Sequence, residues 1–205
     1  MEIIWLGRSC FRIKGKEAAI LTDPYDEAAN SLMGENIVML SQGEVTERSW
    51  KGTEENVRVI QGPGEYEIAN VLINGFRTLS KSKEEVGKKN TAYLIEMDGV
   101  TLCHMGEAES PLTSEQVTGD IDILFASVGY PSTLKATLEM VNLIEPKVVI
   151  PMQYKTGSST EELQALEVFL KEMGIKEIEP QLKLTVTPST LPLEPKKVMV
   201  LAYSP

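Results

Sequence analysis

Histidine, the most versatile side chain for catalysis and zinc binding, occurs once in this sequence, at His104. It follows the alternating stretch 100–103, and a lone histidine there is more often a hydrogen-bonded structural residue than a catalyst. Ser9 and Cys10 lack the Gly-x-Ser-x-Gly context of a hydrolase nucleophile. Residues 62–64, Gly-Pro-Gly, resemble a phosphate loop only superficially, because no Lys-Ser/Thr pair follows, and they predict a turn.

The first half of the chain is predicted to be β-structure, because short apolar runs are separated by turn residues. Strands are expected at 3–6, 10–13, 18–21, 37–40, 57–60 and 71–73, followed by a hairpin of 91–97 and 100–104 around Asp98-Gly99. Thr22, Asp23 and Pro24 end the third strand, and Asp23 is expected to cap the turn at Pro24.

The second half alternates between strands and helices. Helical spacing of apolar residues predicts a helix over 133–144, ended by Pro146. A second helix is expected over 161–173, with Ser159 or Thr160 as its cap and Gly174 as its C′ residue. Strands are expected at 121–126, 147–150, 182–187 and 197–203. These elements fit an α/β (α+β) chain folded as a four-layer αββα sandwich, one domain over residues 1–205.

The charge and composition exclude several kinds of partner. The formal net charge is −10 without a basic block, so a nucleic acid would be repelled. No apolar run approaches the ~20 residues that span a bilayer, and the N-terminus lacks the features of a signal peptide. Cys10 and Cys103 are far apart in apolar contexts, which favours free, buried thiols over a disulfide. We expect a cytoplasmic protein with no membrane partner.

Six motifs occur in order along residues 2–156. They are Trp-Leu-Gly-Arg-Ser at 5–9, Leu-Thr-Asp-Pro at 21–24, Gly-Pro-Gly-Glu-Tyr at 62–66, Gly-Lys-Lys-Asn-Thr at 87–91, Cys-His-Met-Gly-Glu at 103–107, and Pro-Lys-Val-Val-Ile-Pro-Met-Gln-Tyr-Lys-Thr at 146–156. Together they resemble the metallo-β-lactamase superfamily, and within it the zinc-dependent hydrolase branch that includes the L-ascorbate-6-phosphate lactonases. The resemblance implies the αββα sandwich of that superfamily.

The resemblance also implies where zinc ligands would stand. The family's His-x-His-x-Asp-His motif falls on Gln42, Glu44, Thr46 and Glu47, its third-motif histidine on Ser80, its bridging aspartate on Glu107 and its final histidine on Gln153. His104 matches a histidine that is not a primary ligand. The family's histidine in the opening strand is Arg8 here, and Asp23 would orient ligands in the family.

None of the seven positions carries an imidazole, so we expect no dinuclear zinc centre. Two interpretations remain. In one, Glu44, Glu47 and Glu107 hold a hard cation such as Mg²⁺, Mn²⁺ or Ca²⁺, because these ions prefer oxygen ligands. In the other, no metal or other cofactor binds, and a basic side chain compensates the acidic residues. Arg8 and Arg48 are the candidates, and Arg8 is expected to reach Glu107 or Glu44; alternatively both arginines are ordinary surface residues.

The leading hypothesis is a metallo-β-lactamase-fold protein that has lost its zinc hydrolase activity and acts as a binding or assembly protein, with homo-oligomerisation possible. Its ligand would be a small anionic metabolite recognised by Arg8, Arg48 or Lys155. Gly129, Tyr130 and Pro131 are expected to line one wall of the cavity. The alternative is a divergent hydrolase of lactones or phosphoesters that uses a hard cation or acid–base chemistry by Glu44, Glu47 or Glu107.

Overall fold

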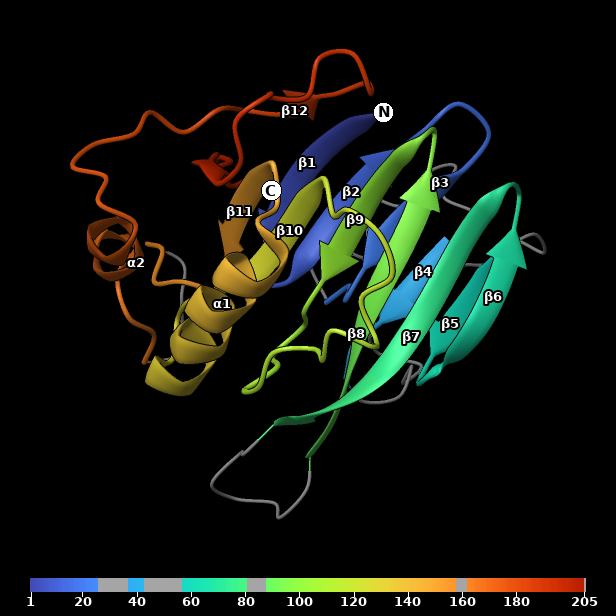
Figure 1. The fold of residues 1–205 in the computed structure, drawn as a ribbon, viewed down its shortest axis with the longest axis horizontal. Helices are drawn as coiled ribbons and strands as arrows, with labels where there is room; N and C mark the ends of the chain where they lie inside the picture. Colours follow the sequence, from blue (N-terminus) through green and yellow to red (C-terminus); the bar gives the residue numbers. More distant parts are fainter. Residues whose placement is uncertain (26–36, 43–56, 81–87, 158–161, 205) are drawn as a thin grey trace.

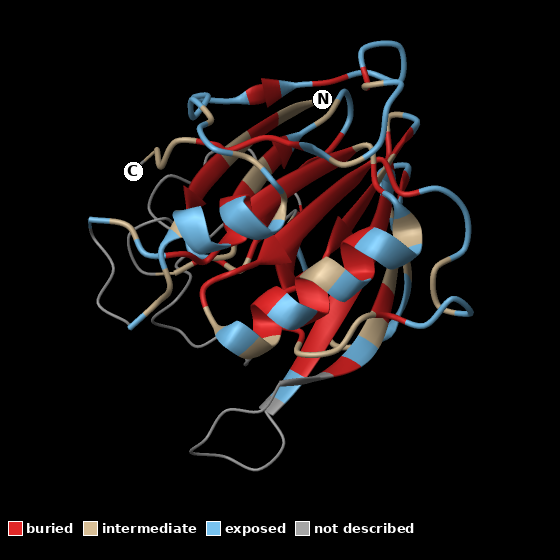
Figure 2. Cartoon of the chain, turned by 60° about the vertical axis from the view of Figure 1, so that its left-hand side comes forward, coloured by how far each residue is buried: buried red, intermediate tan, exposed pale blue. Residues whose placement is uncertain are grey.

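Two β-sheets pack face to face and enclose most of the apolar side chains (Figures 1 and 2). The structure, a computed structural model, describes residues 1–25, 37–42, 57–80, 88–157 and 162–204. The first sheet contains β1 (Glu2–Gly7), β2 (Cys10–Lys14), β3 (Ala19–Thr22), β4 (Ile37–Leu40), β5 (Arg58–Gln61) and β12 (Leu184–Thr185). The second contains β6 (Gly64–Ile68), β7 (Val71–Ser80), β8 (Lys88–Met97), β9 (Val100–His104), β10 (Ile123–Ser127), β11 (Val148–Met152) and β13 (Lys197–Val198).

The six-stranded sheet has the order β12-β1-β2-β3-β4-β5. β1, β2 and β3 form the predicted antiparallel meander, whereas β4 and β5 add parallel to β3. All four residues of β4 are buried, as expected for a strand inside a sheet with parallel neighbours. The chain therefore leaves the carboxyl ends of β3 and β4 at the same edge of the sheet, at Asp23 and Ser41.

The seven-stranded sheet has the order β13-β11-β10-β9-β8-β7-β6. β6 to β9 are antiparallel, and β9, β10, β11 and β13 run parallel to one another. The predicted β8–β9 hairpin is confirmed, because Asp98 and Gly99 both have the positive φ angles, 55° and 77°, that this kind of turn requires. The carboxyl ends of β9, β10 and β11 also meet at one edge.

One of the two described helices lies on the outer face of the seven-stranded sheet, and the other lies beyond β11, beside that sheet (Figure 1). The helix α1 (Pro131–Ile144) confirms the prediction and packs on β10 through Leu134, Met140 and Val141. The central layers of the predicted αββα sandwich and this helical layer are thus present. A helical layer on the outer face of the six-stranded sheet is not seen among the described residues.

The helix α2 (Leu166–Glu172) begins later than predicted, and Ala165 is its N-cap residue. The reason is that both backbone groups of Gln164 are used elsewhere: its N–H donates to the carbonyl of Gly129 (2.7 Å), and its carbonyl accepts from Lys155 (2.9 Å). The proposed caps Ser159 and Thr160 lie outside the described residues. At the other end, Gly174 (φ 71°) is the predicted C′ residue, and the N–H of Ile175 bonds to the carbonyl of Leu170 (2.8 Å), completing a Schellman motif.

The C-terminal strands are shorter than the sequence predicted. β12 and β13 contain two residues each, because the chain crosses the sheet ends and pairs only briefly with β1 and β11. An isolated β-bridge between Gln181 and Leu201 joins the segment before β12 to the segment after β13. No helix in the described part of the chain is long and apolar enough to cross a membrane.

Candidate functional site

Polar side chains from both sheets meet at the edge where the carboxyl ends of the strands converge. Gln42 follows β4 of the first sheet, while Glu107 and Gln153 follow β9 and β11 of the second. Asn90 of β8 and Ser127, the last residue of β10, complete the group. We call these five residues the amide–carboxylate network. Three of the seven positions assigned to zinc ligands, Gln42, Glu107 and Gln153, are therefore brought together.

The carboxylate of Glu107 lies at the centre of this network. Nε2 of Gln42 donates to its Oε2 atom (3.0 Å), and Nε2 of Gln153 donates to its Oε1 atom. An ionised carboxylate can only accept hydrogen bonds, so both amides must turn their nitrogen atoms toward it. The amide oxygen of Gln153 is used as well, because it accepts a hydrogen bond from Oγ of Ser127 (2.7 Å).

Asn90 ties Glu107 to the core of the second sheet. Its side chain is fully buried, and its Oδ1 atom accepts hydrogen bonds from the backbone N–H of Glu107 (2.8 Å) and from Nε2 of Gln42 (3.3 Å). Its Nδ2 atom donates to Oγ1 of Thr78 (2.6 Å) and to the carbonyl of Met105 (2.9 Å). Both donor hydrogens and the acceptor oxygen of this amide are thus satisfied, which fixes the amide orientation.

The backbone holds Gln153 in an unusual conformation. Its φ angle is 55°, in the left-handed region that non-glycine residues seldom adopt, and its side chain is only 5% exposed. Its N–H donates to the carbonyl of Arg8 (3.1 Å), which also accepts from Nε1 of Trp5 (2.9 Å). Its own carbonyl lies against Cα of Gly129, where a Cβ atom would approach it to 1.9 Å. Surrounding contacts therefore impose the strain at Gln153.

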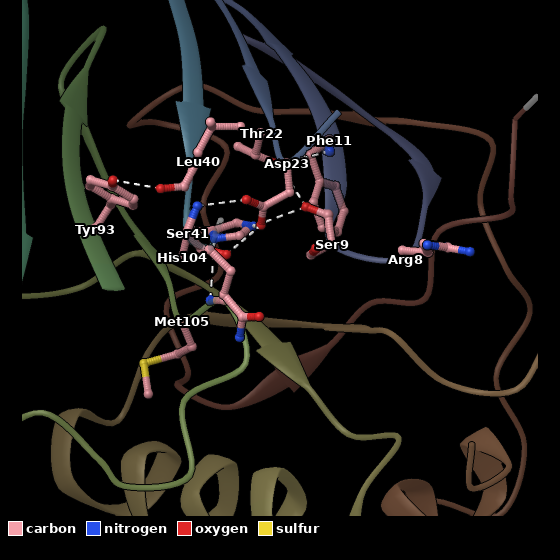
Figure 3. Close-up of polar contacts among 12 residues, drawn as sticks. Arg8, Ser9, Phe11, Thr22, Asp23, Leu40, Ser41, Tyr93, His104 and Met105 are labelled. Atoms are coloured by element: carbon pink, nitrogen blue, oxygen red, sulfur yellow. Dashed lines mark hydrogen bonds and ion pairs between the residues drawn. The ribbon is translucent and has the colours of Figure 1, made fainter. Parts of the chain in front are cut away.

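Asp23, Ser41 and His104 form a second polar cluster beside the network (Figure 3). The carboxylate of Asp23 accepts hydrogen bonds from the backbone N–H (2.6 Å) and the hydroxyl (2.7 Å) of Ser41. The carboxylate of Asp23 thereby joins the ends of β3 and β4, a role that differs from the predicted cap for the turn at Pro24. Nε2 of His104 lies 3.9 Å from this carboxylate.

His104 is hydrogen-bonded through both ring nitrogen atoms, as the sequence predicted. Its ring is fully buried, Nε2–H donates to the carbonyl of Ser9 (3.1 Å), and Nδ1 accepts from the N–H of Gly106 (3.3 Å). These partners fit the neutral imidazole with its proton on Nε2. Burial lowers the pKa of His104 below its ordinary value of 6.5, although the charge of Asp23 and the Ser9 carbonyl act in the opposite direction.

This shift makes stability depend on pH. The unfolded chain takes up a proton near pH 6.5, whereas the folded protein resists protonation until a lower pH. The unfolded state therefore binds more protons, and the free energy of unfolding should fall by up to about 1.4 kcal/mol per pH unit below 6.5. Urea unfolding between pH 5 and 8 measures this slope. Because the chain has one histidine, its imidazole NMR signals can be followed alone, and in the folded protein they should titrate with a midpoint below 6.5; a midpoint at or above 6.5 would contradict the prediction.

A cavity of about 200 Å³ opens beside the two clusters. It is lined by Ser9, Asp23, Pro24, Leu40, Ser41, Gln42 and Glu107. The described wall therefore carries two carboxylates, two hydroxyls and one amide, and it contains no basic side chain. Tyr130 is not among these lining residues; it is the N-cap residue of α1.

Arg8 does not take the predicted position beside Glu107. Its guanidinium lies over the ring of Tyr25, 5.0 Å from the centroid, and Figure 3 shows the side chain directed away from Asp23 and His104. The carboxylate of Glu107 accepts hydrogen bonds from two amides instead. The prediction of an Arg8–Glu107 hydrogen bond is therefore wrong. The alternative contact with Glu44 lies outside the described residues.

The remaining sequence-based site residues can be placed only in part. Glu44, Thr46, Glu47 and Arg48 lie outside the described residues, and Ser80 ends β7 with a side chain that is not described. Cys10 and Cys103 are buried free thiols, as predicted. Burial raises the pKa of Cys103 to about 12, which makes this thiol a poor nucleophile.

Sequence reasoning missed Asn90, Ser127 and Ser41 as members of the site. A signal existed for Asn90, which shares a strand face with the buried residues Ala92 and Leu94. An amide at a buried strand position needs a complete set of partners, and such a position marks a polar network. Ser127 ends an otherwise apolar strand, and nothing in its sequence context distinguishes it.

Two facing sheets, a helix on an outer face and a polar site at the carboxyl ends of the strands define a sandwich of the metallo-β-lactamase type. The family profile described as "Beta-lactamase superfamily domain" matches residues 2–153, and the chain belongs to this family. A crystal structure from Thermotoga maritima, assigned to the Zn-dependent hydrolases of the metallo-β-lactamase superfamily, is 31% identical with a TM-score of 0.78. The match covers 98% of this chain and 97% of that one.

Curated relatives point to the same family. A UPF0173 protein of Pyrococcus abyssi is 26% identical, over 87% of this chain and 98% of its own length. A UPF0173 metal-dependent hydrolase of Pyrococcus furiosus is 29% identical, over 52% of this chain and 49% of its own length. The chain is thus related to metal-dependent hydrolases of the metallo-β-lactamase fold.

The described residues do not fit a zinc centre of that family. Zinc requires imidazole, thiolate or carboxylate ligands, and an amide nitrogen is not a ligand. Gln42 and Gln153 both direct their amide nitrogen to Glu107, and the amide oxygen of Gln153 is engaged by Ser127. Both oxygen atoms of Glu107 thus already accept hydrogen bonds. Within the described ranges, no three His, Cys, Asp or Glu side chains are grouped closely enough for a metal ion.

Proposed function

We propose that this chain is a metallo-β-lactamase-fold protein without a hydrolytic zinc centre, which acts by binding a small molecule or by assembly. The observation that carries the proposal is that the Glu107 carboxylate accepts hydrogen bonds from the amides of Gln42 and Gln153. In a zinc enzyme this carboxylate would face a dication that lowers the pKa of a bound water. Here amide N–H groups provide the positive dipoles, so the site needs no metal for its charge to be compensated.

The network also supports a structural role at this edge of the sandwich. Gln42 follows β4 of the first sheet, whereas Asn90 lies in β8 of the second sheet, and Glu107 and Gln153 follow its strands β9 and β11. The amide of Gln42 therefore links the two sheets through Glu107 and Asn90. A metal ion held by residues from both sheets would make the same kind of link, and the hydrogen bonds replace it with neutral donors.

The cavity supports the binding part of the proposal. Its described wall offers hydroxyl, amide and carboxylate groups around a volume of about 200 Å³. Because Asp23 and Glu107 are both carboxylates, this wall disfavours the anionic metabolite expected from the sequence. We propose a small, neutral and polar ligand instead, one with hydroxyl or amide groups that bond to Ser9, Ser41 and Gln42.

A metal-dependent hydrolase remains the second candidate, because relatives carry that description and Glu107 is a carboxylate. Elemental analysis distinguishes the metal-free binding protein from the hydrolase. It is done after purification without chelator, and again after soaking in Zn²⁺ or Mn²⁺. We expect less than about one metal ion per ten chains, because a carboxylate that already accepts hydrogen bonds from two amides is a poor metal ligand. The Thermotoga maritima relative serves as the comparison protein. Stoichiometric metal, with lactonase or phosphodiesterase activity that Glu107→Ala abolishes, would overturn the proposal.

The same variant tests the network directly. Glu107→Ala removes the acceptor of the Gln153 amide nitrogen and one of the two acceptors of the Gln42 amide nitrogen, which should lower the free energy of unfolding by about 1–3 kcal/mol. This loss should be equal in buffer with EDTA and in buffer with Mn²⁺, because it does not involve a metal. Glu67→Ala, at an exposed position of β6, is the control and should change stability by less than about 0.5 kcal/mol. If Glu107→Ala lost stability only in the buffer with Mn²⁺, the result would support the metal-dependent hydrolase instead.

A further inference from the structure

The wall of the central cavity has many free hydrogen-bond acceptors and few free donors. Most of its accessible surface belongs to polar atoms. The described residues that line it are Ser9, Asp23, Pro24, Leu40, Ser41, Gln42 and Glu107. Each hydroxyl, amide and carboxylate has a fixed number of donor hydrogens and lone pairs. The hydrogen bonds that these side chains already make therefore determine what a ligand has to supply.

The donor hydrogens of the wall are almost all in use. Both hydrogens of the Gln42 amide are taken, one by Oε2 of Glu107 (3.0 Å) and one by Oδ1 of Asn90 (3.3 Å). Ser41 gives its N–H to one oxygen of Asp23 (2.6 Å) and its hydroxyl hydrogen to the other (2.7 Å). Among the described side chains of the wall, the hydroxyl of Ser9 alone keeps a hydrogen without an acceptor.

The acceptors of the wall are largely free. The Gln42 side chain uses its nitrogen in both of its contacts, so its Oε1 atom has no partner among the described residues. Each oxygen of the Asp23 and Glu107 carboxylates accepts one of the hydrogen bonds described above, which leaves a further lone pair on all four. A ligand in this cavity therefore needs several donor groups and few acceptors.

Charge and shape restrict this donor-rich ligand further. Two carboxylates and no basic side chain in the described wall disfavour an anion. An ammonium ion would lose its hydration at carboxylates whose charge is already partly compensated by their own donors. Water supplies donors but has no apolar part, whereas Pro24 and Leu40 offer the C–H groups of an organic ligand a surface for packing. A neutral molecule with several hydroxyl groups on a carbon chain meets all these conditions.

We infer that the central cavity binds a short, neutral polyol. Its hydroxyl groups donate to the carboxylates of Asp23 and Glu107 and to Oε1 of Gln42, and one of them accepts from the hydroxyl of Ser9. This inference rests on the proposed binding function of the site and names the class of its ligand. The volume of about 200 Å³ is below the ~300–1,000 Å³ typical of sites for drug-sized ligands, so the cavity accommodates a single small polyol.

Erythritol and butane-1,4-diol are the probes, because they share a carbon chain and differ in two hydroxyl groups. Titration of each into labelled wild-type protein, followed by NMR, should give saturable shifts at the amides of Ser41 and Gln42. We expect erythritol to bind at least about tenfold more tightly, since the diol leaves acceptors unpaired. Erythronate, which carries a carboxylate, should give no saturable shifts, and 4-aminobutan-1-ol should bind more weakly than erythritol.

Ser9→Ala tests the donor of the wall. The lost hydroxyl has no partner among the described residues, and the backbone carbonyl of Ser9 still accepts from Thr22 and His104, so the variant should fold. Its affinity for erythritol should be at least about threefold lower than that of the wild type. Ser189→Ala, at an exposed turn, is the control and should leave the affinity unchanged.

Equal affinities of erythritol and butane-1,4-diol would overturn the inference, as would an absence of saturable shifts or tighter binding of erythronate or 4-aminobutan-1-ol. An unchanged affinity in folded Ser9→Ala would contradict the assigned donor. The comparison of probes uses wild-type protein, so a poorly folded variant would not affect it. Metal-free protein that does not bind erythritol would refute the polyol alone, whereas stoichiometric metal in the elemental analysis would refute the proposed function itself.

Discussion

Gly129→Ala is expected to destabilise the protein severely, by at least about 3 kcal/mol, and to reduce the yield of folded protein. The new Cβ atom would lie 1.9 Å from the carbonyl oxygen of Gln153 and 2.9 Å from Cδ2 of Leu163. A backbone oxygen cannot move aside as a side chain can, and the backbone of Gln153 is already fixed by its hydrogen bond to Arg8. The clash therefore has to displace the loop after β10 or the end of β11.

Gly157→Ala is the matched control. Apart from its chain neighbours, no heavy atom of the described residues lies within 4 Å of the position where its Cβ atom would be, and its φ angle is outside the positive range. This variant should change the free energy of unfolding by less than about 0.5 kcal/mol. Urea unfolding and circular dichroism of both variants test the prediction. If Gly129→Ala were as stable as Gly157→Ala, the tight packing of Gly129 on Gln153 would be wrong.

The fold was predictable because each local pattern agrees with its tertiary context. Short apolar runs between turn residues predicted the strands of the first half, Asp98-Gly99 predicted the β8–β9 hairpin, and Gly174 predicted the end of α2. The start of α2 was not predictable, because it depends on tertiary hydrogen bonds: the N–H of Gln164 donates to the carbonyl of Gly129, and its carbonyl accepts from the N–H of Lys155. The lengths of the C-terminal strands β12 and β13 were overestimated, because their extent also depends on tertiary pairing, with β1 and β11.

The site was only partly predictable. Family motifs placed Gln42, Glu107 and Gln153 in one group, and the structure brings these three together. The sequence suggested that either a hard metal ion or a basic side chain, Arg8 or Arg48, would compensate the acidic residues. Reading side chains one at a time could not show that two neutral amides supply the donors, because that depends on the orientation of both and on Ser127.

The network and the His104 cluster depend on one another through a shared segment. Gly106 donates its N–H to His104, and the N–H of Glu107, the next residue, donates to Asn90. Met105 and Asn90 are also joined, by the bond from Nδ2 to the carbonyl. Residues 104–107 are therefore held by side chains on both sides, which positions the carboxylate of Glu107 before any ligand arrives. Asn90 makes more of these bonds than any other member of the network.

Asn90→Asp should consequently be one of the most harmful changes in the protein. It is nearly isosteric, but it replaces two donor hydrogens with an acceptor that faces the carbonyl of Met105, and it buries a charge near Glu107. We expect a loss of about 3–5 kcal/mol in the free energy of unfolding at pH 7. Asn142→Asp, at an exposed position of α1, is the control and should cost less than about 0.5 kcal/mol.

The pH dependence separates charge from lost hydrogen bonds. Burial and the nearby carboxylate should raise the pKa of an aspartate at position 90 above its value in the unfolded chain. The folded variant then binds more protons than the unfolded one, so its stability relative to Asn90→Ala should improve as the pH falls from 7 to 5. Asn90→Ala, which only removes partners, should lack this recovery. Urea unfolding of both variants at pH 5, 6 and 7 measures the difference; parallel curves would mean that the Asn90 position is open to solvent.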